Sequence, residues 1–319
     1  MGRRPGDRPA RPAGHPLSLL FATRNRQAAE LSHTLARLAP SGLTILLEGE
    51  TGAGKSYLAA ALHRRGRAGR PLVVVDCGAI PETLLAAELF GHTAGAFTDA
   101  TRARTGALLR AGDGTVVLDR IDALAPEAQV TLLRALDERR VTPVGSQASR
   151  PVAARIIALA GAGLTARLDT GEFRSDLYHR IGGFHAQIPP LRRRPEDILP
   201  HAAATLRRFS RHSDRKRLDP EAAELLVAHP WPGNFRELET VLERGSLRSS
   251  GAEIHPADLA LGSECWPQVM ALAAERRLKA SEVTRLYALL VLADEGGNVS
   301  RTARSLGLSR RTLIRWRKE

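Results

Sequence analysis

The sequence contains very little cysteine and no long apolar run. Its two cysteines, Cys77 and Cys265, lie far apart and outside any paired-ligand spacing. That pattern argues against a disulfide framework and a cysteine-based zinc site, so we expect both thiols to be inert. No stretch reaches the roughly 18 apolar residues of a membrane span, and the N-terminus lacks the apolar run of a signal peptide. We therefore expect a cytoplasmic protein with no membrane segment or membrane partner.

Lysine is equally scarce in a chain that is strongly basic. The 319 residues include 47 Lys and Arg against 34 Asp and Glu, a net charge of +13, but lysine occurs only as Lys55, Lys216, Lys279 and Lys318. A basic balance favours a polyanionic partner, nucleic acid before a membrane surface. A general preference for arginine over lysine would give the same excess of positive charge. Only the positions of the charged residues can therefore distinguish a polyanion-binding surface from a compositional bias.

The first half of the chain has an α/β pattern. Residues 1–16 are mostly Pro, Gly and Arg and predict a disordered basic tail. From residue 17 to 190, short apolar runs alternate with helical segments. These runs predict strands at 43–48, 71–75, 115–119 and 155–160, with helices at 81–90 and 126–138 among those between them. Apolar runs separated by helices are typical of a parallel sheet covered on both faces, so we predict an α/β nucleotide-binding subdomain.

The second half is predicted to be helical. After Pro189 and Pro190 the apolar strand runs stop, and amphipathic helices are expected at 196–210, 219–229 and 233–245. We expect these helices to form a smaller helical subdomain over 191–245. Residues 246–280, which are interrupted by Gly and Pro, are expected to be a linker. Residues 281–319 are expected to be a separate all-α domain with a strongly basic end.

A phosphate-binding loop follows the first predicted strand. Gly49, Glu50, Thr51, Gly52, Ala53, Gly54, Lys55 and Ser56 fit G-x-x-x-x-G-K-[ST] in full. In this motif the glycines let backbone N–H groups surround the phosphates, Lys55 reaches the outer phosphates and Ser56 offers a hydroxyl to Mg²⁺. Asp119, at the end of a second strand, supplies the carboxylate that such a site uses to hold the metal. Arg120 follows it, and a cation cannot act as a general base.

Six ordered motifs resemble those of one family over roughly residues 17–319. They are GETGAGKS at 49–56, ELFGHTAGAFTDA at 88–100, GTVVLDRI at 114–121, FRSDLYHRI at 173–181, PPLRRRPEDI at 189–198 and WPGNFREL at 231–238. They resemble the AAA+ ATPase domain of the sigma-54-dependent bacterial enhancer-binding proteins, which is joined to a Fis-type helix-turn-helix. The resemblance implies an AAA+ P-loop core, a helical lid, ATP and Mg²⁺ as ligands, and a homo-oligomer between a dimer and a hexameric ring.

The resemblance also assigns roles to single residues. Arg174 and Arg180 match arginines that reach the ATP of the neighbouring subunit; we expect both at one end of a helix, and two solvated arginines are the alternative. Arg236 matches a sensor arginine that contacts the nucleotide, while Asn234 is expected to cap its helix. The loop Gly95, Ala96, Phe97, Thr98, Asp99 and Ala100 resembles the one that contacts the sigma-54 factor. Asp99 replaces a glycine of the family and adds a negative charge where the partner docks. The loop is therefore expected to contact sigma-54, to contact another partner or to have no partner.

Three departures from the family pattern fall in the catalytic machinery. Arg120 replaces a glutamate that activates water, Asp76 replaces its asparagine partner and Gly161 replaces a polar sensor residue. Because the first two are complementary in charge, we predict an Asp76–Arg120 ion pair. We therefore expect ATP to bind but to be hydrolysed very slowly or not at all.

The last forty residues predict a helix-turn-helix. An apolar helix at 285–294 is followed by two short helices capped by Asn298 and Ser309. This pattern resembles the Fis-type module, in which the last helix enters the major groove. We expect Ser309, Arg310, Arg311, Thr312 and Arg315 to form the DNA-binding surface, with Leu313 and Trp316 packed inward. Arg317 stands where an apolar anchor is expected, so DNA affinity is expected to depend on avidity in an oligomer.

Three functions follow from these patterns. The leading prediction is a transcription regulator that binds ATP and DNA. The second is an active ATPase that remodels sigma-54 polymerase with Asp122 replacing the missing glutamate, although its position three residues beyond Asp119 is expected to point it elsewhere. The third is an adaptor that binds nucleotide without turnover and lends Arg174 and Arg180 to a partner. Because only the tail precedes the core, we expect no receiver or ligand-sensing domain in front of it.

Overall fold

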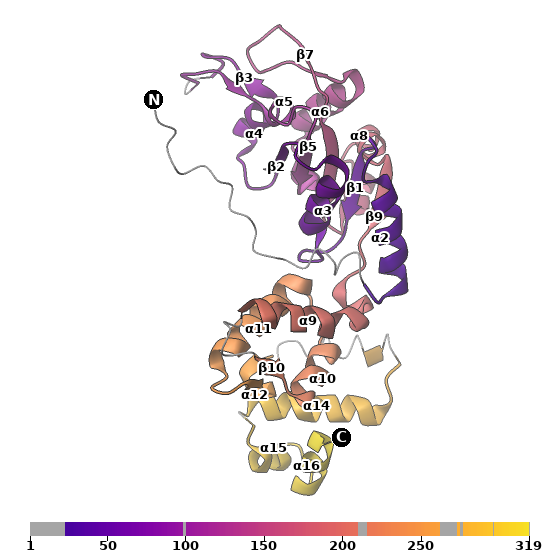
Figure 1. Cartoon of the computed structure of the whole chain (residues 1–319), viewed down its shortest axis with the longest axis vertical. Coiled ribbons are helices and arrows are strands. Elements are labelled where there is room, and N and C mark those ends of the chain that lie inside the picture. The colour runs from indigo at the N-terminus through magenta and orange to yellow at the C-terminus, as the bar shows by residue number, and fades with distance from the viewer. Residues whose placement is uncertain are drawn as a thin grey trace.

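A computed structural model describes residues 23–97, 100–209, 216–261, 273–274, 277–295 and 297–318. The predicted tail, Thr98, Asp99 and Cys265 lie outside these residues. The sheet and its helices form the upper part of the molecule in Figure 1, the lid helices lie below them, and the C-terminal helices lie at the lower end. No helix of the described part is both long and apolar enough to cross a bilayer.

The core is a five-stranded parallel sheet with the order β2-β5-β8-β1-β9. Its strands are β1 (Ile45–Glu48), β2 (Leu72–Asp76), β5 (Thr115–Asp119), β8 (Arg155–Ala160) and β9 (Phe184–Gln187). The first four are the predicted strands. The sequence analysis did not predict β9, because FHAQ is a short edge strand with two half-buried residues and an exposed one, and therefore has no continuous apolar run.

Helices cover both faces of this sheet because neighbouring strand residues point to opposite sides. Ile45 and Leu47 pack with α2 (Arg26–Leu38) and α3 (Lys55–Arg67), while Leu46 packs into the larger cluster on the other face. That second face carries α4 (Glu82–Phe90), α5 (Ala107–Arg110), α6 (Pro126–Glu138), α7 (Leu164–Asp169) and α8 (Ser175–Ile181). The fold class is therefore α/β, as predicted.

Two short antiparallel strand pairs and one short helix complete the α/β part. An antiparallel pair of β3 (Gly91–His92) and β4 (Arg104–Thr105) carries the predicted sigma-contact loop. A second pair joins β6 (Arg140–Val141) to β7 (Arg150–Pro151), and the short helix η1 (Ile121–Ala123) follows β5.

The lid is a separate helical layer with its own core. It contains η2 (Leu191–Arg193), α9 (Pro195–Phe209), α10 (Pro220–Ala228), α11 (Asn234–Arg248) and α12 (Pro256–Leu259), with β10 (Arg217–Leu218) paired to β11 (Glu253–Ile254). Trp231 is fully buried in the centre of the lid, among leucines of α9, α10 and α11.

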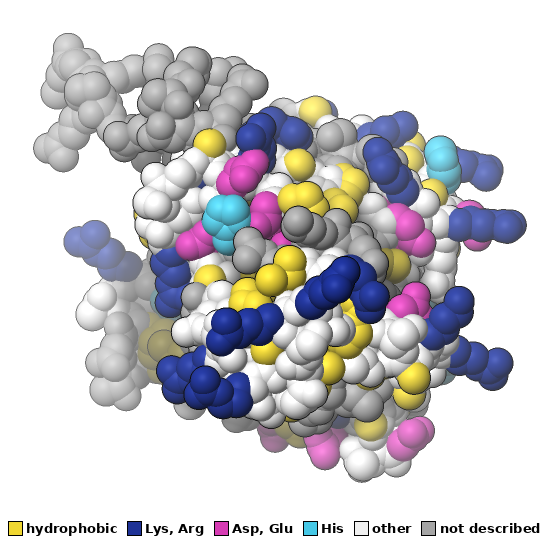
Figure 2. Space-filling model, turned by 90° about the horizontal axis from the view of Figure 1, so that it is seen from below, with side chains coloured by type: hydrophobic (Ala, Val, Ile, Leu, Met, Phe, Trp, Pro, Cys, Tyr) yellow, Lys and Arg dark blue, Asp and Glu magenta, His cyan; other side chains and the backbone are white. Residues whose placement is uncertain are grey.

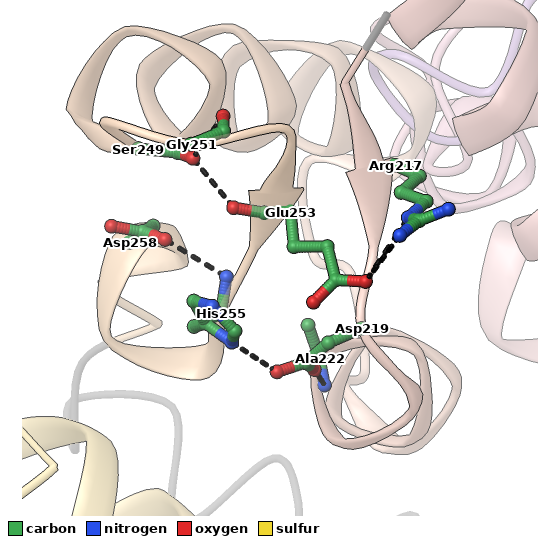
Figure 3. Close-up of polar contacts among 8 residues, drawn as sticks. All are labelled: Arg217, Asp219, Ala222, Ser249, Gly251, Glu253, His255 and Asp258. Carbon is green, nitrogen blue, oxygen red and sulfur yellow. Dashed lines mark hydrogen bonds and ion pairs between the residues drawn. The ribbon is translucent and has the colours of Figure 1, made fainter.

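The first part of the expected linker is packed against the lid. Ile254, Leu259 and Leu261 are buried in the lid core. Figure 3 shows the polar contacts that fasten this segment: Arg217 Nη2 lies 2.8 Å from a Glu253 carboxylate oxygen, and His255 Nδ1 lies 2.5 Å from Asp219 Oδ2. The ordered lid therefore extends to residue 261, whereas residues 262–272 of the expected linker lie outside the described residues.

The C-terminal unit contains α14 (Ala280–Asp294), α15 (Val299–Ser305) and α16 (Arg310–Lys318). Asn298 caps α15 by accepting from Arg301 N–H at 3.0 Å, and Ser309 Oγ accepts from Thr312 N–H at 3.0 Å, so both predicted caps are confirmed. Leu289 and Leu290 of α14 belong to the lid core, and Arg285 forms a 3.0 Å ion pair with Glu224 of α10. The C-terminal unit is thus docked on the lid.

Candidate nucleotide site and DNA-binding surface

The phosphate-binding loop connects β1 directly to α3. Gly52 and Gly54 have φ values of +75° and +100°, a left-handed geometry that favours glycine, and Gly54 occupies the N-cap of α3. Lys55 Nζ donates to the carbonyls of Gly49 at 2.6 Å and Glu50 at 2.9 Å. Burial lowers the pKa of Lys55, and the carboxylates of Asp119 and Asp122 oppose this shift. The helix N-terminus and this ammonium group are suited to bind an anionic phosphate.

Ser56 and Asp119 lie next to each other at this loop, as predicted. Ser56 Oγ donates to Asp119 Oδ2 at 3.2 Å. A hydroxyl and a carboxylate are hard oxygen donors, and Mg²⁺ in nucleotide sites uses one or two such ligands together with phosphate oxygens and waters. The donor set therefore fits Mg²⁺. Within the described ranges, no cluster of three or more His, Cys, Asp or Glu side chains is arranged as a metal site of its own.

A cavity of about 620 Å³ opens above the loop. The core contributes Lys55, Ser56 and Asp119 to its wall, and the lid contributes Phe235 and Arg236 from α11. Asp197, His201 and Glu239 also line it from the lid, with His201 Nε2 3.1 Å from Glu239 Oε1. The sequence analysis placed Arg236 here but missed Asp197, His201, Phe235 and Glu239. They come from two lid helices that approach the loop only in the folded chain.

Arg120 and Asp76 form the predicted ion pair at this cavity. Arg120 Nη2 lies 2.6 Å and Nε 2.7 Å from Asp76 Oδ1, and both side chains are about half exposed. Gly78 makes room for the pair, because a Cβ at that position would lie 2.8 Å from the guanidinium carbon of Arg120. Gly78 N–H also donates to Asp76 Oδ1 at 3.2 Å. The ion-pair prediction is confirmed.

Asp122 lies in the same cavity, so the expectation that it points elsewhere is wrong. The short helix η1 turns the chain immediately after Arg120, and Asp122 becomes part of the cavity wall. Its Oδ1 is buried and has no hydrogen-bond partner within the described part of the chain. A Cβ at Gly161 would lie 3.1 Å from Asp122 Oδ2. The side chain missing at Gly161 therefore leaves space that this carboxylate borders.

Arg174 and Arg180 lie at opposite ends of α8, which corrects the expectation that they share one end. Arg174 is the N-cap residue and Arg180 lies in the last turn of this seven-residue helix. Arg174 Nη2 pairs with Asp176 at 2.7 Å, and Arg180 Nε pairs with Asp137 at 2.9 Å. Neither side chain lines the nucleotide cavity of its own chain.

Asn234 does not cap α11, which corrects a second expectation. Gly233 is the N-cap residue and Asn234 has a left-handed φ of +53°. The Asn234 side chain instead accepts from Leu191 N–H at 2.7 Å and donates to Thr51 O at 3.0 Å. Asn234 thus connects the lid to the phosphate-binding loop.

The predicted sigma-contact loop is closed by its own backbone. Gly95 N–H donates to Ala100 O at 2.7 Å, and Ala100 N–H donates to Phe97 O at 2.9 Å. The Phe97 ring lies 4.9 Å from the His92 ring, measured between centroids. Thr98 and Asp99, which belong to the same prediction, lie outside the described residues.

The predicted DNA-binding residues lie on the C-terminal helices. Figure 2 views the molecule from this end and shows several Lys and Arg side chains on the near surface. Arg310, Arg311 and Arg315 of α16 are exposed, whereas Leu313 is buried against Leu292 and Ala303 as predicted. Trp316 is half-buried and its carbonyl accepts from Arg285 Nε at 3.1 Å. The Ser309 and Thr312 hydroxyls lie 2.7 Å apart at the start of the helix.

The fold and the site define a P-loop nucleotide-binding core of the AAA+ type with a helical lid. Three family models cover the chain in order. The sigma-54 interaction domain matches residues 21–187, the AAA+ ATPase lid domain matches 192–263 and the bacterial regulatory protein, Fis family, matches 289–319. The chain belongs to the family of bacterial regulators that carry a sigma-54 interaction domain, with an AAA+ lid and a Fis-type helix-turn-helix.

Similar proteins agree with this assignment. The chain is 40% identical over 288 residues to the transcriptional regulatory protein ZraR of Klebsiella oxytoca, covering 89% of this chain and 65% of that protein. It is 42% identical over 244 residues to the sigma54-dependent transcriptional activator SfnR of Pseudomonas putida, covering 75% and 66%. The chain therefore spans about two thirds of the length of these relatives.

A solved structure shows the same fold. The crystal structure of NtrX from Brucella abortus in complex with ATP superimposes with a TM-score of 0.68 at 30% identity, covering 93% of this chain and 68% of that one. Its complex with ADP gives a TM-score of 0.69 at 30% identity, covering 91% and 67%.

Proposed function

We propose that this chain is an ATP-binding, sequence-specific DNA-binding transcription regulator of the sigma-54 interaction type with impaired ATP hydrolysis. ATP and Mg²⁺ bind at residues 49–56, Asp119 and Arg236. This is supported by the loop geometry, the Ser56–Asp119 contact and the ATP complex of NtrX. DNA binds to the α16 surface that contains Ser309, Arg310, Arg311, Thr312 and Arg315. This is supported by the Fis-family match and the exposed arginines.

The Arg120–Asp76 ion pair carries the proposal of impaired hydrolysis. A guanidinium group is never deprotonated in proteins and cannot accept a proton from water. The pair also holds the Asp76 carboxylate at Arg120, so Asp76 is not free to activate water in its place. Loss of a general base costs about 10²–10⁴-fold in rate.

Other functions of the family are part of the same proposal. The chain assembles as a homo-oligomer in the cytoplasm, and Arg174 and Arg180 reach the ATP of a neighbouring subunit. Both arginines lie at the surface and outside their own cavity, which supports this role. The loop from Gly95 to Ala100 contacts the sigma-54 factor, as the family match supports.

Two assays on the purified chain test the proposal. ATP titration by calorimetry measures binding, and phosphate release with saturating ATP and Mg²⁺ measures turnover. We expect saturable binding with turnover at least about 10²-fold below that of an active relative such as ZraR, assayed in parallel. Turnover equal to the relative's would contradict impaired hydrolysis, and failure to bind would contradict the ATP site itself.

A second candidate function is an active ATPase in which Asp122 activates water. It is favoured by one observation: Asp122 lines the cavity with a buried, unpartnered Oδ1 in the described structure, beside the space left at Gly161. A carboxylate so placed is a general-base candidate. The Asp122→Asn substitution would abolish any turnover that depends on this carboxylate, and unchanged turnover would exclude Asp122 as the base.

A further inference from the structure

The segment that leads into α11, residues 231–235, lies directly against the phosphate-binding loop. We call this segment the turn. Phe235 N–H donates to Gly52 O at 3.1 Å. A Cβ at Gly52 would lie 2.1 Å from Gly233 O, so the two backbones meet with no room for a side chain. The lid therefore contacts the loop through its main chain, at the segment that must bend around a phosphate.

This turn has an unusual backbone. Trp231 and Asn234 have φ values of +50° and +53°, a conformation that costs free energy for a residue other than glycine. The turn is held by its surroundings, because Trp231 is fully buried and its indole N–H donates to Leu226 O at 2.7 Å. Such conformations persist where the structure over-determines them, and they point to a functional demand.

The strained turn brings Asn234 to the loop, where it acts together with Arg192. The two terminal nitrogens of the Arg192 guanidinium group donate to the Glu50 carboxylate, Nη1 to Oε2 at 2.8 Å and Nη2 to Oε1 at 2.6 Å. Asn234 Nδ2 donates to Glu50 Oε2 at 3.1 Å and to Thr51 O at 3.0 Å. The hydrogen bond from Arg192 is the largest cause of a lowered Glu50 pKa. A bidentate, charge-assisted contact of this kind fixes geometry as well as adding energy.

The contacts continue along the loop. Arg194, which is buried, donates from Nη2 to Ala53 O at 3.3 Å, and its guanidinium lies 4.9 Å from the Phe235 ring centroid. Each of the four consecutive residues from Glu50 to Ala53 therefore has a polar contact with the lid. Glu50 makes this contact through its carboxylate, whereas Thr51, Gly52 and Ala53 make it through their carbonyl oxygens. The lid therefore holds three consecutive carbonyls of the loop on its own side.

We propose that Arg192 and Asn234 are positioning residues, which hold the phosphate-binding loop in its nucleotide-binding conformation from the lid. This rests on the proposed binding of ATP at residues 49–56. When the lid is docked the loop is ordered in advance, so ATP does not have to order it on binding. Lid docking and nucleotide binding are then a single coupled equilibrium.

The test compares the full chain with Arg192→Ala, Asn234→Gly and the matched control Arg193→Ala. Glycine accepts the left-handed φ at position 234, so Asn234→Gly removes the side chain without adding strain. Arg193 is a neighbouring positive charge that also lowers the Glu50 pKa, and its removal leaves the three hydrogen bonds from Arg192 and Asn234 to the Glu50 carboxylate in place. Calorimetry with ATP measures affinity, and hydrogen exchange of the amides at 49–56 without nucleotide measures loop order.

We expect Arg192→Ala and Asn234→Gly to weaken ATP affinity by about tenfold and to speed loop exchange, with Arg193→Ala within about twofold of the parent chain. In a double-mutant cycle, Arg192→Ala should have little further effect on affinity in a Glu50→Gln background. Should Arg192→Ala unfold, Arg192→Lys keeps the charge without the bidentate contact and should give an intermediate loss.

Two results would overturn the proposal. One is loop exchange in Arg192→Ala and Asn234→Gly equal to that of Arg193→Ala, whether or not the parent chain binds ATP. The other is a lowered melting temperature with unchanged ATP affinity, which is the signature of a merely structural role. A parent chain that fails to bind ATP contradicts the proposed function, and the exchange measurement still decides the positioning role.

Discussion

Arg120 and Asp76 are joined at 2.6 Å across the ends of two neighbouring parallel strands. The register pairs Asp76 of β2 with Asp119 of β5, so two carboxylates meet at the edge of the sheet where the phosphate-binding loop lies. Arg120, the residue after Asp119, forms its ion pair with the Asp76 carboxylate. Under the proposed function, Asp119 therefore remains available to hold Mg²⁺, and the ion pair occupies the position where the family resemblance places a water-activating glutamate.

Restoring a glutamate at this position should restore turnover. We expect the double variant Asp76→Asn with Arg120→Glu to hydrolyse ATP about 10²-fold faster or more than the parent chain, because it supplies a base without placing two carboxylates together. Steady-state phosphate release at saturating ATP and Mg²⁺ measures this. Arg120→Gln breaks the ion pair without adding a base and is the matched control. Equal rates for the control and the double variant would show that the missing base does not limit the reaction.

The arginines at the start of α16 should control DNA affinity. The Arg310→Ala, Arg311→Ala double variant should bind its DNA site at least about tenfold more weakly, because each good arginine contact with a base contributes about 1–3 kcal/mol. Mobility-shift titrations at several salt concentrations measure affinity and the number of phosphate contacts. Arg26, which is exposed on α2 far along the chain, gives the control Arg26→Ala. An unchanged affinity and salt slope would refute the assignment of this surface.

His229 should make the protein less stable in mild acid. Burial lowers the pKa of His229 from 6.5 to about 4, so below pH 6.5 the unfolded chain binds a proton that the folded lid does not. The free energy of unfolding should therefore be highest above pH 6.5 and fall by about 3 kcal/mol as the pH approaches 4. Urea unfolding at a series of pH values measures this slope.

The control is His229→Asn. Its side-chain oxygen can accept from the backbone N–H of Trp231, as His229 Nδ1 does in the parent chain. Glu237 lies close to His229 and has a pKa raised by burial, so it works in the opposite direction, adding stability as the pH falls. The difference between the parent chain and His229→Asn isolates the histidine. An identical slope in both proteins would show that another group causes the acid sensitivity.

Arg155 should be essential for the docking of α2. Its side chain is almost fully buried at the start of β8 and donates to the carbonyls of Leu38 at 3.0 Å, Ala39 at 2.5 Å and Leu43 at 3.2 Å. Arg155→Met should lower the free energy of unfolding by about 2–4 kcal/mol. The carbonyls of Ala39 and Leu43 lose their guanidinium donor, at about 1–3 kcal/mol each, whereas Leu38 O still accepts from Ser41. The removal of a desolvated charge offsets part of this loss. Urea unfolding measures the change, with exposed Arg150→Ala as the control. A loss below about 1 kcal/mol would mean that water replaces the guanidinium.

The sequence by itself determined the parts of the protein that depend on local pattern. Three of the four apolar runs became the inner strands β5, β8 and β1, because a strand buried on both faces needs a continuous apolar run. The fourth became the edge strand β2, which is only partly buried. The glycine spacing of residues 49–56 fixed the phosphate-binding loop, and Asn298 and Ser309 fixed the starts of α15 and α16. The opposite charges of Asp76 and Arg120, which replace an asparagine and a glutamate of the family pattern, were sufficient to predict their ion pair.

Only the tertiary structure decided contacts between segments that are remote in the sequence. Asn234 sits where a helix cap is expected, but the buried Trp231 and a left-handed backbone turn it toward Glu50 and Thr51, more than 180 residues away. Asp122 enters the cavity because η1 bends the chain after β5, and the helical spacing of Arg174 and Arg180 becomes two opposite ends because α8 is short. Local residue patterns specify turns, caps and strands. The direction in which a side chain points depends on packing, which no short stretch of sequence contains.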